Sequence, residues 1–544
     1  MKVSQEQATW RNMPNKWQLT VIAAARITEL LSERSQATYI FYQLQSFAAP
    51  GGTSESQAVS QAGILLASWA AAQSIAAVWW GRAANSPRLG RKGVILIGLA
   101  GTFVSSLCSG FAKSFNQLLA LKVFAGVSNT NLGIMRTMIG ETTSPRFESK
   151  AFLVFPMCLS IGEVLGPLLG GFLADPSASD SSEMTIPKNS RRGSDSDLMS
   201  RFPFALPNFI CGLFILLSAL MVAFGLDETH PLLAKNGRDP CRRMGQWMLK
   251  KLWAGGVRMD RYERLAGEDD ERLDVALAYI GPSSSLGRGV ANRMSLELAG
   301  SSTTLPATQL TSQSPNEHQP RKLLTWRVRL TLLTHFALML HLSAFHTIIP
   351  SFLSAQQAKA IQKPSGLHLA GGLGLSLNQV GAAVAVLSLM GLVLQLLVYP
   401  TVVSRMGLYM CYRIFLPFSA LAYLFMPFTV LLRKDFWVLL PVLLLLFGFQ
   451  ALSRTFAQPG MIKLINSCGS HPQLRSTIHG IGLSVGSLAR IVGPVCSGWI
   501  LRIGLEGNTV SVAWWGMALA AAVNWFLLLI MRSMHFGHKT PGTS

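Results

Sequence analysis

The sequence predicts an all-α membrane protein with about twelve transmembrane helices in two pseudo-symmetric six-helix bundles. Half of its 544 residues are hydrophobic and only 13% are charged, whereas a soluble chain carries about 25% charged residues. Apolar runs of about 20 residues recur along the chain, and each is long enough to cross the hydrocarbon core as a helix. Helices are expected because open strands cannot satisfy their backbone hydrogen bonds in lipid.

A long-period repeat predicts the division into two bundles. Residues 160–173 (SIGEVLGPLLGGFL) return as residues 487–500 (SLARIVGPVCSGWI), with the Gly-Pro pair and the apolar positions in register. Only Glu163 against Arg490 reverses the sign of a charge. Such a repeat in a very hydrophobic chain indicates two related bundles with a site between them.

The apolar runs place six spans on each side of a long polar segment. The first bundle, 17–226, has spans near 17–44, 60–80, 93–112, 116–139, 151–174 and 204–226. The second bundle, 327–532, has spans near 327–354, 378–403, 412–432, 436–464, 476–501 and 510–532.

Basic residues predict the orientation, because Lys and Arg concentrate in short cytosolic loops. The turn after the second span holds Arg82, Arg88, Arg91 and Lys92, whereas the first connection, 47–56, holds no basic residue. We therefore expect a cytosolic N-terminus (1–16), central segment (227–326) and tail (533–544). The net charge of +21 is attributed to this bias, so the bilayer rather than nucleic acid is the expected partner.

The polar segments have distinct expected roles. Residues 242–253 place apolar side chains on one helical face and basic ones elsewhere, which predicts a helix lying on the cytosolic leaflet. Residues 281–322 have the composition of a disordered linker. The insertion within 175–203 is expected on the outer side. Seven cysteines without a Cys-x-x-Cys pair indicate neither a disulfide framework nor a zinc site.

A stripe of small residues marks the fifth span. Small residues at the interface let transmembrane helices approach closely, and a proline removes a backbone hydrogen bond and kinks the helix. A tight helix crossing would explain this stripe without any further role. The pattern also resembles the antiporter signature of the major facilitator superfamily. Its residues are Gly162, Gly166, Pro167, Gly170 and Gly171.

The turn after the second span resembles a second signature of that superfamily. The family's aspartate, which helps to lock the inner gate, is Asn85 here, and Ser86-Pro87 lengthens the turn. An amide forfeits a charge-assisted hydrogen bond, so the gate equilibrium is expected to differ from the family's. The candidate gating residues are Gly81, Asn85, Arg88, Gly90, Arg91 and Lys92.

Other stretches narrow the resemblance to the fungal zinc-induced-facilitator-like branch. They are residues 26–29, 129–141, 227–231, 454–459 and 477–480. This resemblance implies proton-coupled efflux of a small organic compound, such as a fungal secondary metabolite or toxin. It also implies a monomer in the plasma membrane, or alternatively the vacuolar membrane, with no cofactor beyond the proton gradient. A metal or potassium exchanger and a non-transporting sensor are the alternatives.

Charges within the first span supply an independent physical argument. Arg26, Glu29, Glu33 and Arg34 would cost about 10–14 kcal/mol if they faced lipid. They must therefore face protein or a hydrated cavity. An Arg26–Glu29 ion pair with a purely structural role and a substrate or proton path are both open interpretations.

Candidate proton-coupling residues are acids, or stand where the family has coupling residues. Lys122 takes the place of a family arginine, and His346 stands where relatives carry aspartate. For Glu163, a proton carrier and a structural acid are both open. The proton-coupling candidates are Glu29, Glu33, Glu163, Lys122 and His346.

Polar residues on the spans predicted to face the central cavity form the substrate-cavity set. They are Arg26, Asn129, Asn131, Arg136, His341, Arg454, Gln458, His479 and Arg490. The histidines of the seventh span lack the spacing of metal ligands, so no metal site is expected. No P-loop and no catalytic residues are predicted.

Overall fold

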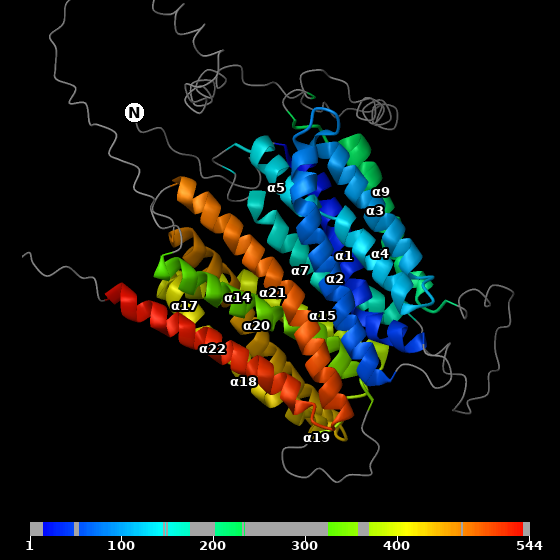
Figure 1. Ribbon diagram of the computed structural model, residues 1–544, viewed down its shortest axis with the longest axis vertical. Coiled ribbons are helices and arrows are strands. Elements are labelled where there is room, and N and C mark those ends of the chain that lie inside the picture. The colour runs from blue at the N-terminus through cyan, green and yellow to red at the C-terminus, as the bar shows by residue number, and fades with distance from the viewer. Residues whose placement is uncertain are drawn as a thin grey trace, which may run out of the picture. The chain divides into compact units, whose positions relative to one another are not determined.

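The computed structural model describes residues 15–47, 54–144, 151–174, 202–230, 325–356, 369–468 and 472–536, together with 13, 147 and 233. The regular elements of these segments are helices (Figure 1), which confirms the predicted fold class. Eleven helical segments are long and apolar enough to cross a membrane. The first helix is equally long and differs from them by its charged residues.

The first bundle follows the predicted spans with two differences. Its second helix extends beyond the predicted 60–80 at both ends, and its fourth span is broken at residues 129–130. The helices are α1 (Lys16–Ser46), α2 (Glu55–Ala84), α3 (Gly90–Ser109), α4 (Phe115–Ser128), α5 (Asn131–Thr142), α7 (Val154–Leu173) and α9 (Ala205–Gly225).

The second bundle contains two irregular spans that the sequence did not predict. The eighth span contains a π-helical turn. The ninth begins at Leu408, directly after Gly407 at φ 76°, and its α-helix is interrupted at Leu416 and by a 3-10 turn at Met426–Phe428. The elements are α14 (Trp326–Ser354), α15 (Leu377–Val393), η4 (Leu394–Val398), α16 (Tyr399–Met406), α17 (Leu408–Phe415), α18 (Pro417–Phe425), η5 (Met426–Phe428), α19 (Thr429–Leu432), α20 (Phe436–Ser467), α21 (Pro472–Glu506) and α22 (Ser511–Phe536).

The sequence repeat corresponds to a repeat in packing. A Cβ added to Gly166 of α7 would lie 2.5 Å from the Arg34 Cβ of α1, and one added to Gly493 of α21 would lie 2.1 Å from the Ser343 Oγ of α14. The fifth helix of each bundle therefore packs against the first helix of its own bundle at the same position of the repeat.

Glycines of the same two helices also make the contacts between the bundles. A Cβ on Gly171 of α7 would lie 2.9 Å from the Gly381 Cα of α15, and a Cβ on Gly63 of α2 would lie 2.3 Å from the Pro494 O of α21. Figure 1 shows α2 and α21 side by side. The small-residue stripe predicted as a helix crossing thus serves crossings both within and between bundles.

We name the end of the helices that carries the basic turn 82–92 the basic end. The contacts that we find between the bundles lie at the middle of the helices or toward the opposite end. Tyr42 Oη donates to the Leu375 O at 2.6 Å, and Ser56 Oγ donates to Glu506 Oε1 at 2.8 Å. Both contacts lie near the ends of helices, far from the basic turn.

Three predictions fall on residues that the structure does not describe. The predicted interfacial helix 242–253, the linker 281–322 and the insertion within 175–201 lie outside the described residues. These predictions, and the membrane sides assigned to them, remain predictions.

Candidate functional site

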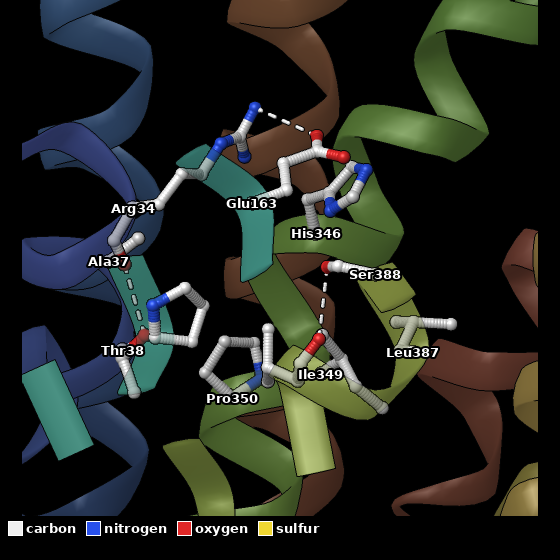
Figure 2. A pocket seen from close by; sticks show the side chains of 11 residues that line it. Arg34, Ala37, Thr38, Glu163, His346, Ile349, Pro350, Leu387 and Ser388 are labelled. Atoms are coloured by element: carbon white, nitrogen blue, oxygen red, sulfur yellow. Dashed lines mark hydrogen bonds and ion pairs between the residues drawn. The ribbon is translucent and has the colours of Figure 1, made fainter. Parts of the chain in front are cut away.

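A small cavity lies between the two bundles at mid-height. Its wall combines residues of α1 and α7 with residues of α14 and α15 (Figure 2). Its volume is about 30 Å³, which is room for one or two water molecules. The polar groups in the wall are those of Arg34, Thr38, Glu163, His346 and Ser388.

Glu163 forms the polar centre of this interface. Its side chain is buried, with 7% exposed, and Arg454 Nη2 of α20 donates to both carboxylate oxygens, at 2.7 and 2.9 Å. Arg34 Nη2 of α1 lies 3.4 Å from Glu163 Oε1. One carboxylate of the first bundle is therefore shared between a cation of its own bundle and a cation of the other.

Local packing explains how Arg34 reaches Glu163. Gly162 and Gly166 stand one turn apart on α7, and each would clash with α1 if it carried a Cβ, with Leu30 and Arg34 respectively. This close approach brings the side chain of α1 over Glu163. His346 of α14, half-buried, completes the group and interacts electrostatically with Glu163, Arg34 and Arg454.

The acids of the first span differ in how firmly they are held. Glu29, with 2% of its surface exposed, accepts a hydrogen bond from Arg26 Nη1 at 3.0 Å and another from Asn131 Nδ2. The predicted Arg26–Glu29 pair is therefore present. Glu33 is half-buried and interacts electrostatically with Arg34, Lys122 and Arg490; we find no hydrogen bond to its carboxylate from a described residue.

Lys122 lies within the first bundle rather than against the second. Its Nζ donates to Gln36 Oε1, and Gln36 Nε2 donates to Asn208 Oδ1 at 2.8 Å. The chain thus links α4, α1 and α9.

The break in the fourth span exposes backbone groups that side chains then satisfy. Gln73 Nε2 of α2 donates to the Asn129 O at 2.7 Å, and Trp80 Nε1 donates to the Val127 O at 2.6 Å. Asn131 packs against Gly98 of α3, where a Cβ would lie 2.2 Å from its Oδ1. The predicted candidates Asn129 and Asn131 therefore flank a discontinuous helix, a feature that lines ion and substrate paths in other transporters.

The remaining substrate-cavity candidates are dispersed. His341 is buried in the second bundle, where its Nδ1 lies 3.2 Å from Tyr423 Oη, to which Gln450 Nε2 donates at 2.9 Å. Arg136 is exposed, 5.8 Å over the ring of Phe155.

Two candidates belong to the second half of the fold, and a third cannot be placed. Arg490 is exposed on α21 and hydrogen bonds to Ser487, and it interacts electrostatically with Glu33 of α1. Gln458 is half-buried on α20, four residues after Arg454. His479 belongs to α21, but its side chain lies outside what the structure describes.

The basic turn is held by acids that the sequence analysis did not single out. Glu228 accepts from the backbone N–H groups of Arg91 and Lys92 at 3.1 and 3.0 Å, and the Arg91 side chain pairs with Glu141. Gly90 has φ +66° there, and its added Cβ would lie 2.4 Å from Glu228 Oε2. These contacts stay within the first bundle.

Asn85 contributes to this turn through its backbone. Its side chain is exposed, and its carbonyl oxygen lies 3.1 Å from His230 Nε2. The carboxylates beside the turn therefore come from Glu228 and Glu141, whereas the family's aspartate would have supplied one at position 85. The resemblance of residues 227–231 and 129–141 to the branch was the available signal for both acids.

The structure also bears on metal binding. Among the described residues, no three His, Cys, Asp or Glu side chains are grouped so that they could hold a metal ion.

The comparison with protein families decides the identity of the fold. The family model described as "Major Facilitator Superfamily" matches residues 37–494. The chain belongs to the major facilitator superfamily.

The relatives of this chain include proteins of fungi and plants. The Aspergillus fumigatus "Major facilitator superfamily multidrug transporter mfsB" is 25% identical over 94% of this chain and 82% of its own length. The Aspergillus niger "Efflux pump azaK" is 29% identical over 34% of this chain and 35% of its own. The Arabidopsis thaliana "Protein ZINC INDUCED FACILITATOR 1" is 27% identical over 35% of this chain and 37% of its own length. A zinc-induced facilitator is thus among the relatives of this chain, in line with the resemblance of its motifs to that branch.

Solved structures of transporters share the fold. The human organic anion transporter MFSD10 matches with a TM-score of 0.53 and 18% identity, over 95% of this chain and 99% of that one. The peptide transporter POT in complex with sulfate matches with a TM-score of 0.57 and 12% identity, over 95% of this chain and 94% of that one. At these identities the likeness extends to the fold alone.

Proposed function

We propose that this transporter exports a small organic compound in exchange for protons. The observation that carries the proposal is the buried Glu163–Arg454 pair, which joins the two bundles beside a cavity at mid-height. Charged groups are costly within a bilayer and mark substrate or ion paths. A secondary transporter of this architecture holds its site at the same place, between the repeats.

The relatives support the direction of transport. Two of them carry the names multidrug transporter and efflux pump, and the first aligns with nearly the whole chain. We extend export to this chain on that basis.

Glu33 is the acid that we assign to proton exchange. Glu29 is held by Arg26 and Asn131, and Glu163 by Arg454 and Arg34. A carboxylate that gives and takes protons during each cycle has to exchange them with water or substrate. Glu33, half-buried on the same stripe as Glu29, is the acid of this set whose carboxylate we find without a hydrogen bond from a described residue.

The described contacts between the bundles support an assignment of the conformation. They lie at the middle and at the end opposite the basic turn. If the basic end faces the cytosol, as the Lys and Arg bias predicts, this conformation is closed outward. Release of these contacts would open the cavity to the outside.

Reconstituted protein tests this function. We would place the full chain in liposomes with a proton-sensitive dye inside, impose a pH gradient, and offer ethidium and carboxyfluorescein as organic probes. The proposal predicts probe movement driven by the gradient, with protons moving in the opposite direction. Glu33→Gln should abolish the proton movement, whereas the exposed control Asp435→Asn should retain it.

The same liposomes separate the alternatives. Proton movement driven by potassium or zinc gradients and indifferent to organic probes would favour the ion exchanger. Probe binding without any flux would favour a sensor, and either result would overturn the proposal.

A further inference from the structure

Positive charge exceeds negative charge around Glu33 and Glu163. Glu33 interacts electrostatically with Arg34, Lys122 and Arg490. Glu163 interacts with Arg34 and Arg454. Four cations therefore share two carboxylates. An uncompensated charge within the membrane region is unfavourable unless a counter-charge joins it.

Arg34 is the arginine of the cavity wall, and it makes the longer of the two arginine contacts with Glu163. Glu163 lies at 2.7 and 2.9 Å from Arg454 but at 3.4 Å from Arg34. The Arg34 Nε is buried and has no hydrogen-bond partner among the described residues. Arg454 thus draws the carboxylate toward α20 and leaves donors of the Arg34 guanidinium unused.

The rest of the cavity wall suits an apolar body. Ala37 of α1 and Ile349, Val384 and Leu387 of the second bundle face the same space as Arg34. Figure 2 shows the charged groups at one side of this cavity and the aliphatic and proline side chains at the other. Sites of this kind combine an apolar lining with few polar groups that fix the orientation of the ligand.

We propose that the substrate is an organic monoanion, whose carboxylate, sulfonate or phosphate-ester oxygens bind the free donors of Arg34. Its apolar body lies against Ile349, Val384 and Leu387. This inference adds the chemical class of the substrate to the proposed function. It rests on that function, because the bound anion is a substrate only if the protein transports it. The binding site itself can be tested separately.

Charge balance favours a negatively charged ligand. Arg34 and Arg454 share Glu163, and Glu33 is shared between Arg34, Lys122 and Arg490. Positive charge therefore remains in excess, and a monoanion offsets part of it without any group having to be protonated. The cavity of about 30 Å³ is smaller than such a ligand, so binding has to separate α1 and α7 from α14 and α15. That separation is the motion that alternating access requires.

Three naphthalene probes of equal size test the charge preference. They are 2-naphthoate, 2-naphthamide and 2-naphthylmethylammonium, and the readout is the Tm of the purified full chain as each is titrated. The anion should raise the Tm in a saturable way, while the neutral and cationic probes should have little effect. Equal shifts with all three, or the largest shift with the cation, would overturn the inference.

Two substitutions of the cluster should act in opposite directions. Arg34→Gln should weaken naphthoate binding at least about tenfold, because the ligand loses a charged donor. Glu163→Gln should strengthen it by about tenfold, because a neighbouring negative charge is removed. An unfolded variant cannot show such a gain. Arg329→Gln, an exposed cation near the start of α14, should leave the affinity unchanged.

The two proposals fail in different experiments. Naphthoate binding that follows these substitutions, without any proton-driven flux in liposomes, would retain the anion site and reject the exporter. Proton-coupled export of ethidium with no response of the Tm to naphthoate would retain the exporter and reject the anion site. Glu163→Gln without a gain in naphthoate affinity would also reject it.

Discussion

At the scale of single residues, Glu163 is the one described acid that bonds to a cation of the opposite bundle at the middle of the membrane region. The sequence predicted both Glu163 and Arg454 as candidates but not their pairing. They are 291 positions apart, and the register between two helices depends on packing that no local pattern encodes. For Glu163, the structure shows a carboxylate held by two cations, and both interpretations of its role stay predictions.

The Glu163–Arg454 pair should show energetic coupling. We expect Glu163→Gln and Arg454→Gln each to lower the free energy of unfolding by about 3–5 kcal/mol, because each leaves a buried charge without its partner. The double substitution should cost less than the sum of the two. Thermal unfolding of the four proteins in one detergent measures this coupling, and strictly additive losses would show that the pair does not act as a unit.

The basic turn yields a second prediction at this scale. Glu228 accepts two backbone N–H groups at the first turn of α3, so Glu228→Gln should cost about 1–2 kcal/mol in stability. Asp435→Asn, an exposed acid at the start of α20 without a side-chain cap hydrogen bond, provides the matched control. Equal losses in the two variants would show that Glu228 does not hold the turn.

At the scale of helices, hydropathy predicted most of what the structure shows. Apolar runs located the spans because their length is set by the bilayer. The π turn at Leu394–Val398 was not predicted, because it keeps a mostly apolar composition and changes only the backbone hydrogen bonding. The break at residues 129–130 was not predicted, because Asn129 and Thr130 are equally compatible with the polar lining of a continuous helix. The glycine stripe predicted a close crossing, but the residue pattern alone does not say which of its glycines faces the other bundle.

Gly63 provides the test of the contact between α2 and α21. Gly63→Ala should lower the Tm, because the new Cβ would stand 2.3 Å from the Pro494 O and force the helices apart. Gly81→Ala in the same helix meets no atom within 4 Å, so it should be neutral or stabilise by up to about 1 kcal/mol. A Gly63→Ala variant as stable as Gly81→Ala would place the two helices further apart than described.

At the scale of the whole molecule, the repeat is the organising feature. Matched glycines pack α7 on α1 and α21 on α14, and then join α7 to α15 and α21 to α2. The sequence predicted the two bundles because the repeat can be recognised from the residue types alone. The sequence did not predict at which end the bundles are in contact. A transporter adopts more than one conformation with the same sequence, and the contacts depend on which conformation is the more stable.

Distances across the two ends of the same molecule test the central claim, which is that the bundles move against each other around the charged cavity. Spin labels at Gly81→Cys and Ser404→Cys report on the basic end, and labels at Gln57→Cys and Asn508→Cys report on the opposite end; all four positions are exposed. The account predicts that a pH gradient with 2-naphthoate shortens the first distance while it lengthens the second. Distances that stay fixed at both ends, or change in the same direction, would contradict it.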